Sequence, residues 1–293
     1  MADIATTIEE QIALLESRGM KIDDKEKAKE NLLDIGYYRL GFYWFPFEKT
    51  YPRKIGRIHD FKEGTEFDNV IKLYYFDFDL RNLLLKYISR IEINFRTTLV
   101  YLASNKYKDN PFWYNDSQCV NKSFLEDNLY IDAIKEANKN EVIKQDLKIH
   151  KRKFAPAWKL IENLSFGIVV LLYENLLDGG LRHQIAQKYK MSSSQFSSYI
   201  NAIRRLRNYC AHGQVLFDVN LPVAISNGPA GDLGNRKTKL YGAYKVFKYI
   251  LGQVSTNRVN DMTNELKFAF SKVNNQAVKD VICNNSGFRE EDI

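Results

Sequence analysis

The chain has 293 residues, of which 45% are hydrophobic, so it can bury a substantial core as one large domain or two small ones. A net charge of +7 is compatible with an acidic partner such as RNA, but many proteins that bind no nucleic acid are equally basic. Three cysteines without paired spacing argue against a disulfide framework, and neither a signal-peptide pattern nor a membrane-length apolar run is found, so we expect a cytoplasmic protein with no membrane partner.

Two short amphipathic helices are predicted at the start of the chain, over residues 5–18 and 24–35. Gly19 lies in the turn between them. Gly36 stops the second helix, because glycine is the usual residue just past a helix C-terminus. The N-terminal region is therefore expected to be helical.

Large aromatic side chains crowd the next segment, from Tyr37 to Phe47. We favour packing in a core, because aromatic rings bury a large apolar area. The alternative is that exposed rings beside Arg39 form a stacking platform for single-stranded RNA. The two interpretations differ in whether these rings are exposed.

The longest helical pattern runs from Phe67 to Lys106, with apolar residues in a stripe along one face. Since this length exceeds that of the usual globular helix, a kink or a second helix is expected within it. Glu92 and Arg96 lie one turn apart here, and opposite charges at this spacing commonly pair.

The middle of the chain, from Lys106 to His150, is polar and rich in asparagine, with a modest helix predicted from Phe124 to Glu136. The basic run from Lys144 to Lys153 is typical of a solvated face and less often of a phosphate track. Strong apolar periodicity then predicts a core helix from Trp158 to Leu177, ended by Asp178-Gly179-Gly180.

A capping box opens the helix that carries the most informative motif. Ser192 can cap the helix, and Gln195 three residues later completes the pattern, so the helix should begin near residue 193. At 100° per residue, Arg207, Asn208 and His212 fall away from its apolar side. The motif is therefore expected to face solvent.

The spacing of Arg207 and His212 places a condition on their function. Five residues apart, they diverge by about 140° on an ideal helix and can meet one ligand only where the helix ends or distorts. Gly213 supplies a suitable ending.

Two interpretations compete for this motif. In the structural one, Arg204, Arg205 and Arg207 form a solvated basic face, and His212 is favoured by the negative end of the helix dipole. In the functional one, His212 acts as a general base or acid, because its ordinary pKa lies near working pH. Arg207 would hold the scissile phosphate of RNA through its bidentate fork. Asn208 could orient either the ring or the phosphate.

A loop and a helix are predicted after the motif. Residues from Ile225 to Thr238 are rich in Gly, Asn and Pro and predict a mobile loop. An amphipathic helix is predicted from Tyr241 to Leu251, and the tail beyond Cys283 is expected to be frayed. His59, His150, His183 and His212 are far apart in the sequence and form no ligand-spaced cluster, so no metal and no cofactor is expected.

The chain resembles the Abi-like family of bacterial abortive-infection proteins, the AbiD/AbiF group, whose HEPN-type RNase domain is marked by Arg-Asn-x-x-x-His. The resemblance spans residues from about 14 to about 251. Where many relatives continue with a second histidine and an arginine, this chain has Gly213 and Val215. Besides Arg207–His212, the matching blocks are Ile35–Leu40 with Tyr43 and Pro46-Phe47, Phe61–Thr65 with Phe67, Phe76-Asp77 with Leu80-Arg81, and Pro156-Ala157-Trp158 with Glu162 and Ser165-Phe166-Gly167.

The resemblance implies an all-α fold: a HEPN-like helical bundle over residues 63–280, an N-terminal helical and aromatic-rich extension over 1–62, and a flexible tail over 281–293. It also implies a metal-independent endoribonuclease of phage defence that leaves a 2′,3′-cyclic phosphate. Arg207, His212 and Asn208 would be catalytic. Glu92 would support them as part of a second wall of the active groove, although a purely structural ion pair is the simpler role for it.

Partners follow from the same resemblance. Arg204, Arg205, Arg96 and Arg39 would contact RNA. HEPN nucleases commonly set two motifs face to face, and this chain has one Arg-x-x-x-x-His, so a homodimer with a composite site is expected. An antitoxin or a small non-coding RNA could restrain it. A non-catalytic module that grips a structured RNA or a partner protein is the competing function, and a purely structural scaffold is a third.

Overall fold

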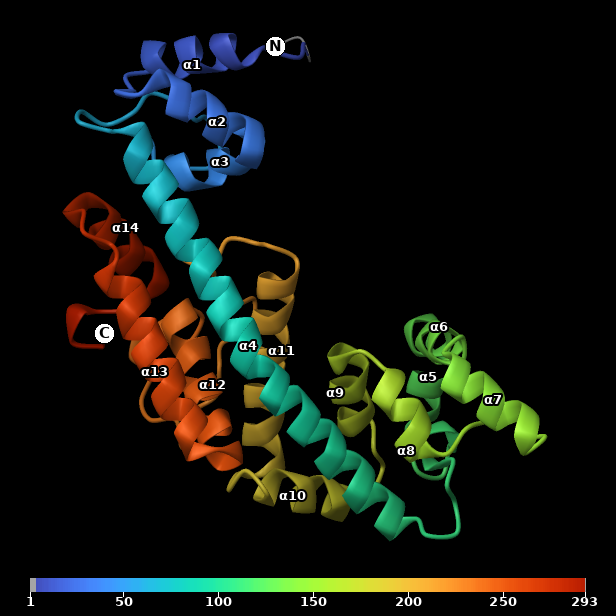
Figure 1. Ribbon diagram of the computed structural model, residues 1–293. Coiled ribbons are helices and arrows are strands. Elements are labelled where there is room, and N and C mark those ends of the chain that lie inside the picture. The colour runs from blue at the N-terminus through green and yellow to red at the C-terminus, as the bar shows by residue number, and fades with distance from the viewer. Residues whose placement is uncertain (1–3, 293) are drawn as a thin grey trace. The chain divides into compact units, whose positions relative to one another are not determined.

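A computed structural model describes residues 4–292, which form fourteen α-helices and no β-strand (Figure 1). The all-α prediction is therefore confirmed. The chain divides into two compact units. The first unit holds the residues up to Leu83, the segment Gly213–Val219 and the residues from Thr263 onward, and the second unit holds Leu84–His212 and Asn220–Met262.

Capped helices build the N-terminal part of the first unit. Thr7 and Glu10 form a capping box at the start of α1, and the Asp24 carboxylate accepts the Lys27 N–H at 2.9 Å to start α2. Gly36, with φ of 91°, ends α2, so the two N-terminal helices are confirmed. The helices that contribute to this unit are α1 (Ile8–Ser17), α2 (Lys25–Ile35), α3 (Tyr37–Trp44), the start of α4 (Phe67–Lys106), most of α13 (Thr256–Ser271) and α14 (Gln276–Ser286).

The aromatic segment forms α3 and the 3-10 turn Phe45–Phe47. Tyr43, Trp44 and Phe47 are buried, as core packing requires. Tyr38 and Phe42 are exposed, and their ring centroids lie 5.4 Å apart. The core interpretation thus holds for most of the segment.

Helix α4 is one uninterrupted helix of 40 residues, so the expected second helix is wrong. The sequence explains this continuity, because it contains no glycine or proline between Phe67 and Lys106 to break the backbone ladder. Its apolar stripe is buried along the whole length, at Val70, Leu73, Leu80, Ile91, Phe95 and Leu99 among others.

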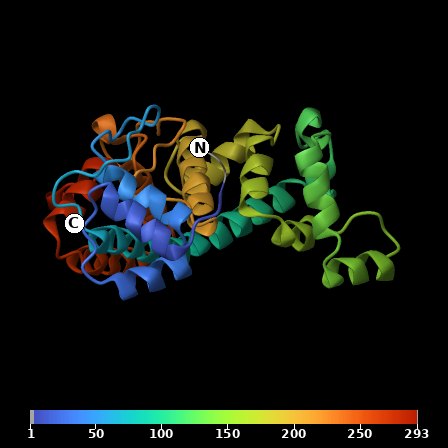
Figure 2. The same cartoon turned by 90° about the horizontal axis from the view of Figure 1, so that it is seen from above.

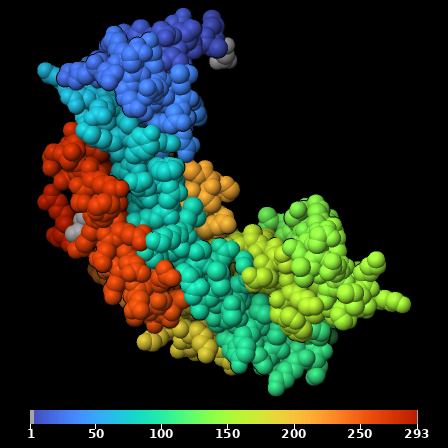
Figure 3. Space-filling view, viewed as in Figure 1, coloured from blue at the N-terminus to red at the C-terminus, as the bar shows by residue number. Residues whose placement is uncertain are grey.

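In the second unit, α11 packs against α9, α10 and α12. Figure 2 shows α5, α6 and α7 at one end of this unit, with α8 and α9 between them and α11, and in the space-filling view of Figure 3 the green α6–α7 region projects from the unit's surface. The helices are α5 (Lys122–Leu125), α6 (Asn128–Ala137), α7 (Glu141–Ile149), α8 (Ala157–Leu160), α9 (Phe166–Glu174), α10 (Gly179–Gln187), α11 (Ser193–Ala211) and α12 (Leu240–Val254).

Two predicted helices of this unit are each divided in the structure. The first is split into α5 and α6, because the Asp127 carboxylate accepts the Leu129 N–H at 2.8 Å and starts a new helix. The second is split into α8, a 3-10 turn and α9, with Ser165 capping α9. Asp178 likewise starts α10 rather than ending the preceding helix.

The loop predicted from Ile225 to Thr238 is tied down by hydrogen bonds. The Ser226 N–H donates to Ser198 Oγ at 2.9 Å, and the Ala230 N–H donates to Tyr199 Oη at 3.2 Å. The helix predicted after it is confirmed as α12.

The C-terminal residues pack where the sequence indicated fraying. Helix α14 continues past Cys283 to Ser286 and ends at Gly287 in the left-handed conformation. Phe288 is 2% exposed, and its ring lies 5.4 Å from that of Phe270.

Candidate functional site

The motif helix α11 begins and ends as its sequence predicts. Ser192 Oγ accepts the Gln195 N–H at 3.3 Å, and Gln195 Oε1 accepts the Ser192 N–H at 3.2 Å. The helix ends at Ala211, with His212 as its C-terminal cap and Gly213 at a φ of 63°. The helix therefore ends directly beside His212, as the position of Gly213 predicts.

The motif's polar side chains are accessible on the surface of the second unit. Asn208 and His212 are exposed, and Arg207 is half-buried. The His212 backbone N–H donates to the Asn208 carbonyl oxygen at 3.0 Å, which continues the helical ladder by one residue. Among the described residues, neither the His212 ring nor the Asn208 amide has a side-chain hydrogen bond, so both can contact a ligand.

Glu92 links the motif to α4 within the second unit. One of its carboxylate oxygens, Oε2, lies 3.9 Å from Arg207 Nε, and the other, Oε1, accepts from Arg96 Nη2 at 3.0 Å. Arg96 also donates to the Leu164 carbonyl oxygen at 2.9 Å and is buried. The ion pair of Glu92 with Arg96, predicted from their spacing, is therefore present. Glu92 also lies beside the guanidinium group of Arg207.

The two preceding arginines occupy different environments. Burial lowers the pKa of Arg204, which lies beside Glu174. Burial also raises the pKa of Glu174, although its carboxylate accepts a hydrogen bond from the Asn201 amide. Arg205 lines a hollow formed with residues 221–225. Arg204 and Arg205 therefore share the motif's helix without sharing its carboxylate partner.

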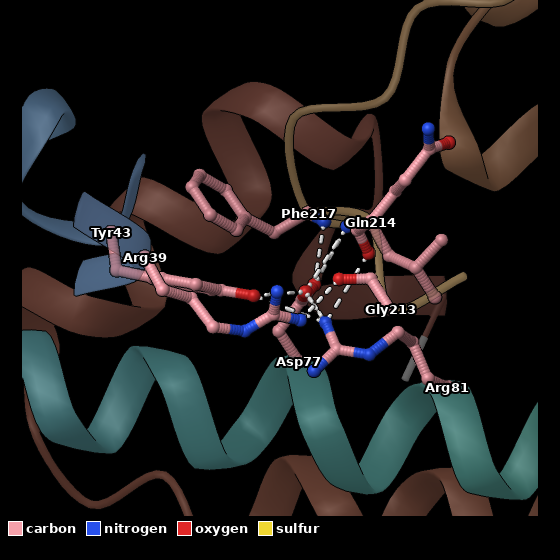
Figure 4. A network of polar contacts seen from close by, with 8 residues as sticks. Arg39, Tyr43, Asp77, Arg81, Gly213, Gln214 and Phe217 are labelled. Carbon is pink, nitrogen blue, oxygen red and sulfur yellow. Dashed lines mark hydrogen bonds and ion pairs between the residues drawn. The ribbon is translucent and has the colours of Figure 1, made fainter. Parts of the chain in front are cut away.

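A buried ionic network in the first unit holds the segment that follows His212 (Figure 4). Its centre is Asp77 on α4, which is fully buried. Asp77 accepts the backbone N–H groups of Leu216 at 3.0 Å and Phe217 at 2.8 Å, and the Tyr43 hydroxyl at 3.0 Å. Arg81, one turn further along α4, pairs with the same carboxylate.

Burial pulls the pKa values of this network upward. Burial raises the pKa of the Asp77 carboxyl, while the Arg81 charge and the two backbone donors oppose that rise. Burial and the Asp77 charge raise the pKa of the Tyr43 hydroxyl, which therefore stays protonated and donates.

Two arginines extend the network onto backbone carbonyls. Arg39 donates to the Gly213 carbonyl oxygen, and Arg81 donates to that of Gln214 at 3.2 Å. The φ of 63° at Gly213 favours glycine, and a Cβ there would lie 2.7 Å from Arg39 Nη2 and would have to displace that guanidinium. Arg39, expected to contact RNA, is engaged with the residue joined to His212 by a peptide bond.

This network was not predicted as a unit. Its members appear in the sequence as separate blocks, Tyr37-Tyr38-Arg39 and Phe76-Asp77 with Leu80-Arg81. The signal was present in the i,i+4 spacing of Asp77 and Arg81, which are both buried beside apolar residues of α4 such as Phe76 and Leu80.

Metal and membrane sites were also sought over residues 4–292. No group of three or more His, Cys, Asp or Glu side chains there is arranged to hold a metal ion. No helix in the same range has both the length and the apolar character that a bilayer crossing requires.

Comparisons with known proteins give one match. A family model described as Abi-like protein matches residues 30–218, which include the network, the Glu92 pair and the whole of α11. Neither the curated proteins nor the solved structures that were compared match the chain.

Proposed function

The chain belongs to the Abi-like protein family, and from this premise we propose that it is a metal-independent endoribonuclease of a bacterial abortive-infection system. In this proposal the helical chain carries a HEPN-type site at the end of α11 and acts in the cytoplasm. The observation that carries the proposal is the exposure of Asn208 and His212 at the point where the helix ends, with Arg207 beside them.

Each side chain has a chemical role in RNA cleavage. His212 takes the proton from the 2′-hydroxyl or returns one to the leaving 5′-oxygen. The 2′-oxygen then attacks the adjacent phosphorus, the bond to the 5′-oxygen breaks, and a 2′,3′-cyclic phosphate remains. Arg207 stabilises the charge that develops on the phosphate, and Asn208 orients the phosphate or the ring. DNA lacks the attacking hydroxyl and is spared.

Glu92 and the neighbouring arginines support this chemistry. Glu92 limits the rotamers of Arg207, which fixes the guanidinium before the substrate arrives. Arg204 and Arg205 add positive charge along the helix that approaches the motif, which strengthens binding of the RNA backbone.

A homodimer completes the proposed site. The chain carries a single Arg-Asn-x-x-x-His sequence, so two copies are needed to place two such motifs across one cleft. An antitoxin or a small non-coding RNA that covers the motif would keep the nuclease inactive until infection.

The test is cleavage of a mixed RNA pool in EDTA by wild type, His212→Ala and His183→Ala. His183 is exposed on α10 and serves as the matched control. We expect wild type and His183→Ala to cut RNA and His212→Ala to be inactive. Equal cleavage by all three proteins, or cleavage that requires a divalent metal ion, contradicts the proposal.

A second candidate function is RNA binding without cleavage. The observation that favours it is the His212 ring, for which the described residues supply no hydrogen bond to fix the tautomer. In that case none of the three proteins cuts RNA, and RNA affinity falls mainly when Arg204, Arg205 and Arg207 are replaced and when salt is raised.

A further inference from the structure

A hollow of about 370 Å³ lies in the second unit between α4 and the short helix α8. Residues Arg96 to Asn105 of α4 form one side, and Trp158 and Glu162 form the other. This volume lies within the range of small-ligand sites, roughly 300–1,000 Å³. None of the catalytic roles proposed above uses Trp158.

Two aromatic rings stand exposed at this hollow. Trp158 is 53% exposed and Tyr101 is 65% exposed, and neither ring has an aromatic or cation–π partner among the described residues. The other two tryptophans, Trp44 and Trp113, are buried. Exposed aromatic rings at a concave surface are typical of binding sites, because a ligand that covers them buries apolar area that the fold itself leaves in water.

Arg96 connects the hollow to the candidate active site. Its Nη atoms contact Glu92, the Leu164 carbonyl oxygen and, at 3.5 Å, Glu162, whereas its buried Nε atom has no hydrogen-bond partner. Glu92 is also the carboxylate beside Arg207. One carboxylate therefore separates the arginine that lines the hollow from the arginine assigned to the scissile phosphate.

We propose that this hollow binds an unpaired nucleobase of single-stranded RNA, stacked on Trp158 or Tyr101, while a neighbouring phosphate lies at Arg207. The proposal rests on the RNA substrate proposed above. A base suits the site better than an apolar peptide, because the flat π faces of the rings accept any base and Arg207, on the other side of Glu92, can take the neighbouring phosphate. The hollow would then contribute to the choice of nucleotide at the cleavage site.

Tryptophan fluorescence tests this directly, because Trp158 is the exposed tryptophan and Trp44 and Trp113 are shielded. The probe is a single-stranded RNA oligonucleotide added to His212→Ala, which should leave it uncut. We expect saturable quenching that disappears in His212→Ala with Trp158→Phe. An oligonucleotide of equal length with abasic sites should bind weakly and quench little.

A second variant measures the contribution of stacking to affinity. Tyr101→Ala should weaken binding of the oligonucleotide by about 5- to 150-fold, the effect of losing one stacked base. Phe268→Ala, which removes a ring on α13 of similar exposure, 62%, should leave binding unchanged. Quenching retained without Trp158, equal binding of the abasic oligonucleotide, or no RNA binding at all overturns the base-binding proposal.

The outcomes also separate this proposal from the catalytic one. Quenching by RNA together with an inactive wild type upholds the base site in a protein that binds without cutting. Cleavage by wild type with no effect of Trp158→Phe on binding or quenching leaves the nuclease proposal intact and removes the base site.

Discussion

Arg207 differs from its neighbours on α11 in the carboxylate that lies beside it. Its Nε atom is 3.9 Å from Glu92, a distance that restricts the guanidinium without neutralising it by a close bidentate pair. Because Arg207 is half-buried, water and salt screen this interaction less than they would screen a fully exposed pair. Glu92 is therefore a positioning residue, and its effect on catalysis should act through Arg207.

Replacing Glu92 with glutamine tests this role. Loss of a contact worth about 1 kcal/mol should lower kcat/KM for RNA cleavage about fivefold. Glu141→Gln, on an exposed side chain of α7, should leave the rate unchanged. The assay is steady-state cleavage of a fluorogenic RNA. The same substitution is then made in Arg207→Ala. If Glu92→Gln lowers the rate by the same factor in both backgrounds, the two residues are not coupled and the positioning role is contradicted.

Asp77 is a buried carboxylate whose removal should lower the stability of the first unit. Asp77→Ala leaves Arg81 buried without its carboxylate and removes the acceptor for the Leu216 and Phe217 N–H groups. We expect the free energy of unfolding to fall by about 3–5 kcal/mol in urea denaturation. Asp79→Ala, exposed on the same helix, should change it by less than about 0.5 kcal/mol. Similar losses in the two variants would show that the network does not stabilise the first unit.

At the level of elements, the sequence predicts many of the helices, misplaces several of their ends and leaves out α10, α13 and α14. The capping box at Ser192 was readable because an amphipathic run follows it at once. The caps at Asp127 and Ser165 were missed, because apolar residues continue on both sides of them and mask the break. Local periodicity does not show whether such a stretch forms one continuous helix or two helices with a break between them, because tertiary packing decides between the two.

In the candidate site, too, the local features could be predicted from the sequence and the long-range contacts could not. The exposed face of α11 and its end at His212 follow from local spacing. The hydrogen bonds from Leu216 and Phe217 to Asp77 join residues about 140 positions apart. Trp158 meets residues of α4 that lie more than 50 positions earlier in the chain. Contacts of such sequence separation arise from the tertiary fold and leave no periodic signal.

The N-terminus of α10 offers a pH-dependent test. The Leu181 N–H, at 2.8 Å, and Lys106, at 3.2 Å, lower the pKa of Asp178 below its ordinary value of 3.8, while burial opposes them. A lowered pKa means that the folded state prefers the carboxylate, so this stabilisation is present above pH 3.8 and is lost as the pH falls below it.

Asp178→Asn keeps an N-cap oxygen and removes the charge. It should be less stable than wild type by up to about 1 kcal/mol at pH 7, and this deficit should be smaller at pH 3. Asp178→Ala should be the less stable of the two variants at pH 7. Thermal unfolding at both pH values measures this, and an Asp178→Asn deficit that grows toward pH 3 would contradict the assignment.

At the scale of the whole molecule, the single motif predicts association. Light scattering after gel filtration should give a particle of about twice the 34.2 kDa chain mass at micromolar concentration. Activity per chain should fall on dilution below the dissociation constant of the dimer. A monomer that cleaves RNA at full rate would exclude the composite site while leaving the assignments of Arg207 and His212 open to their own tests.

The most direct measurement is the chemistry of the RNA ends made in EDTA. Mass spectrometry of the upstream fragments should show a 2′,3′-cyclic phosphate, and a substrate with one 2′-deoxy sugar at the scissile position should resist cleavage there. His212→Ala should produce neither fragment. Upstream fragments that end in a free 3′-hydroxyl, or cleavage unaffected by the 2′-deoxy substitution, would show that the 2′-hydroxyl is not the nucleophile and contradict the mechanism.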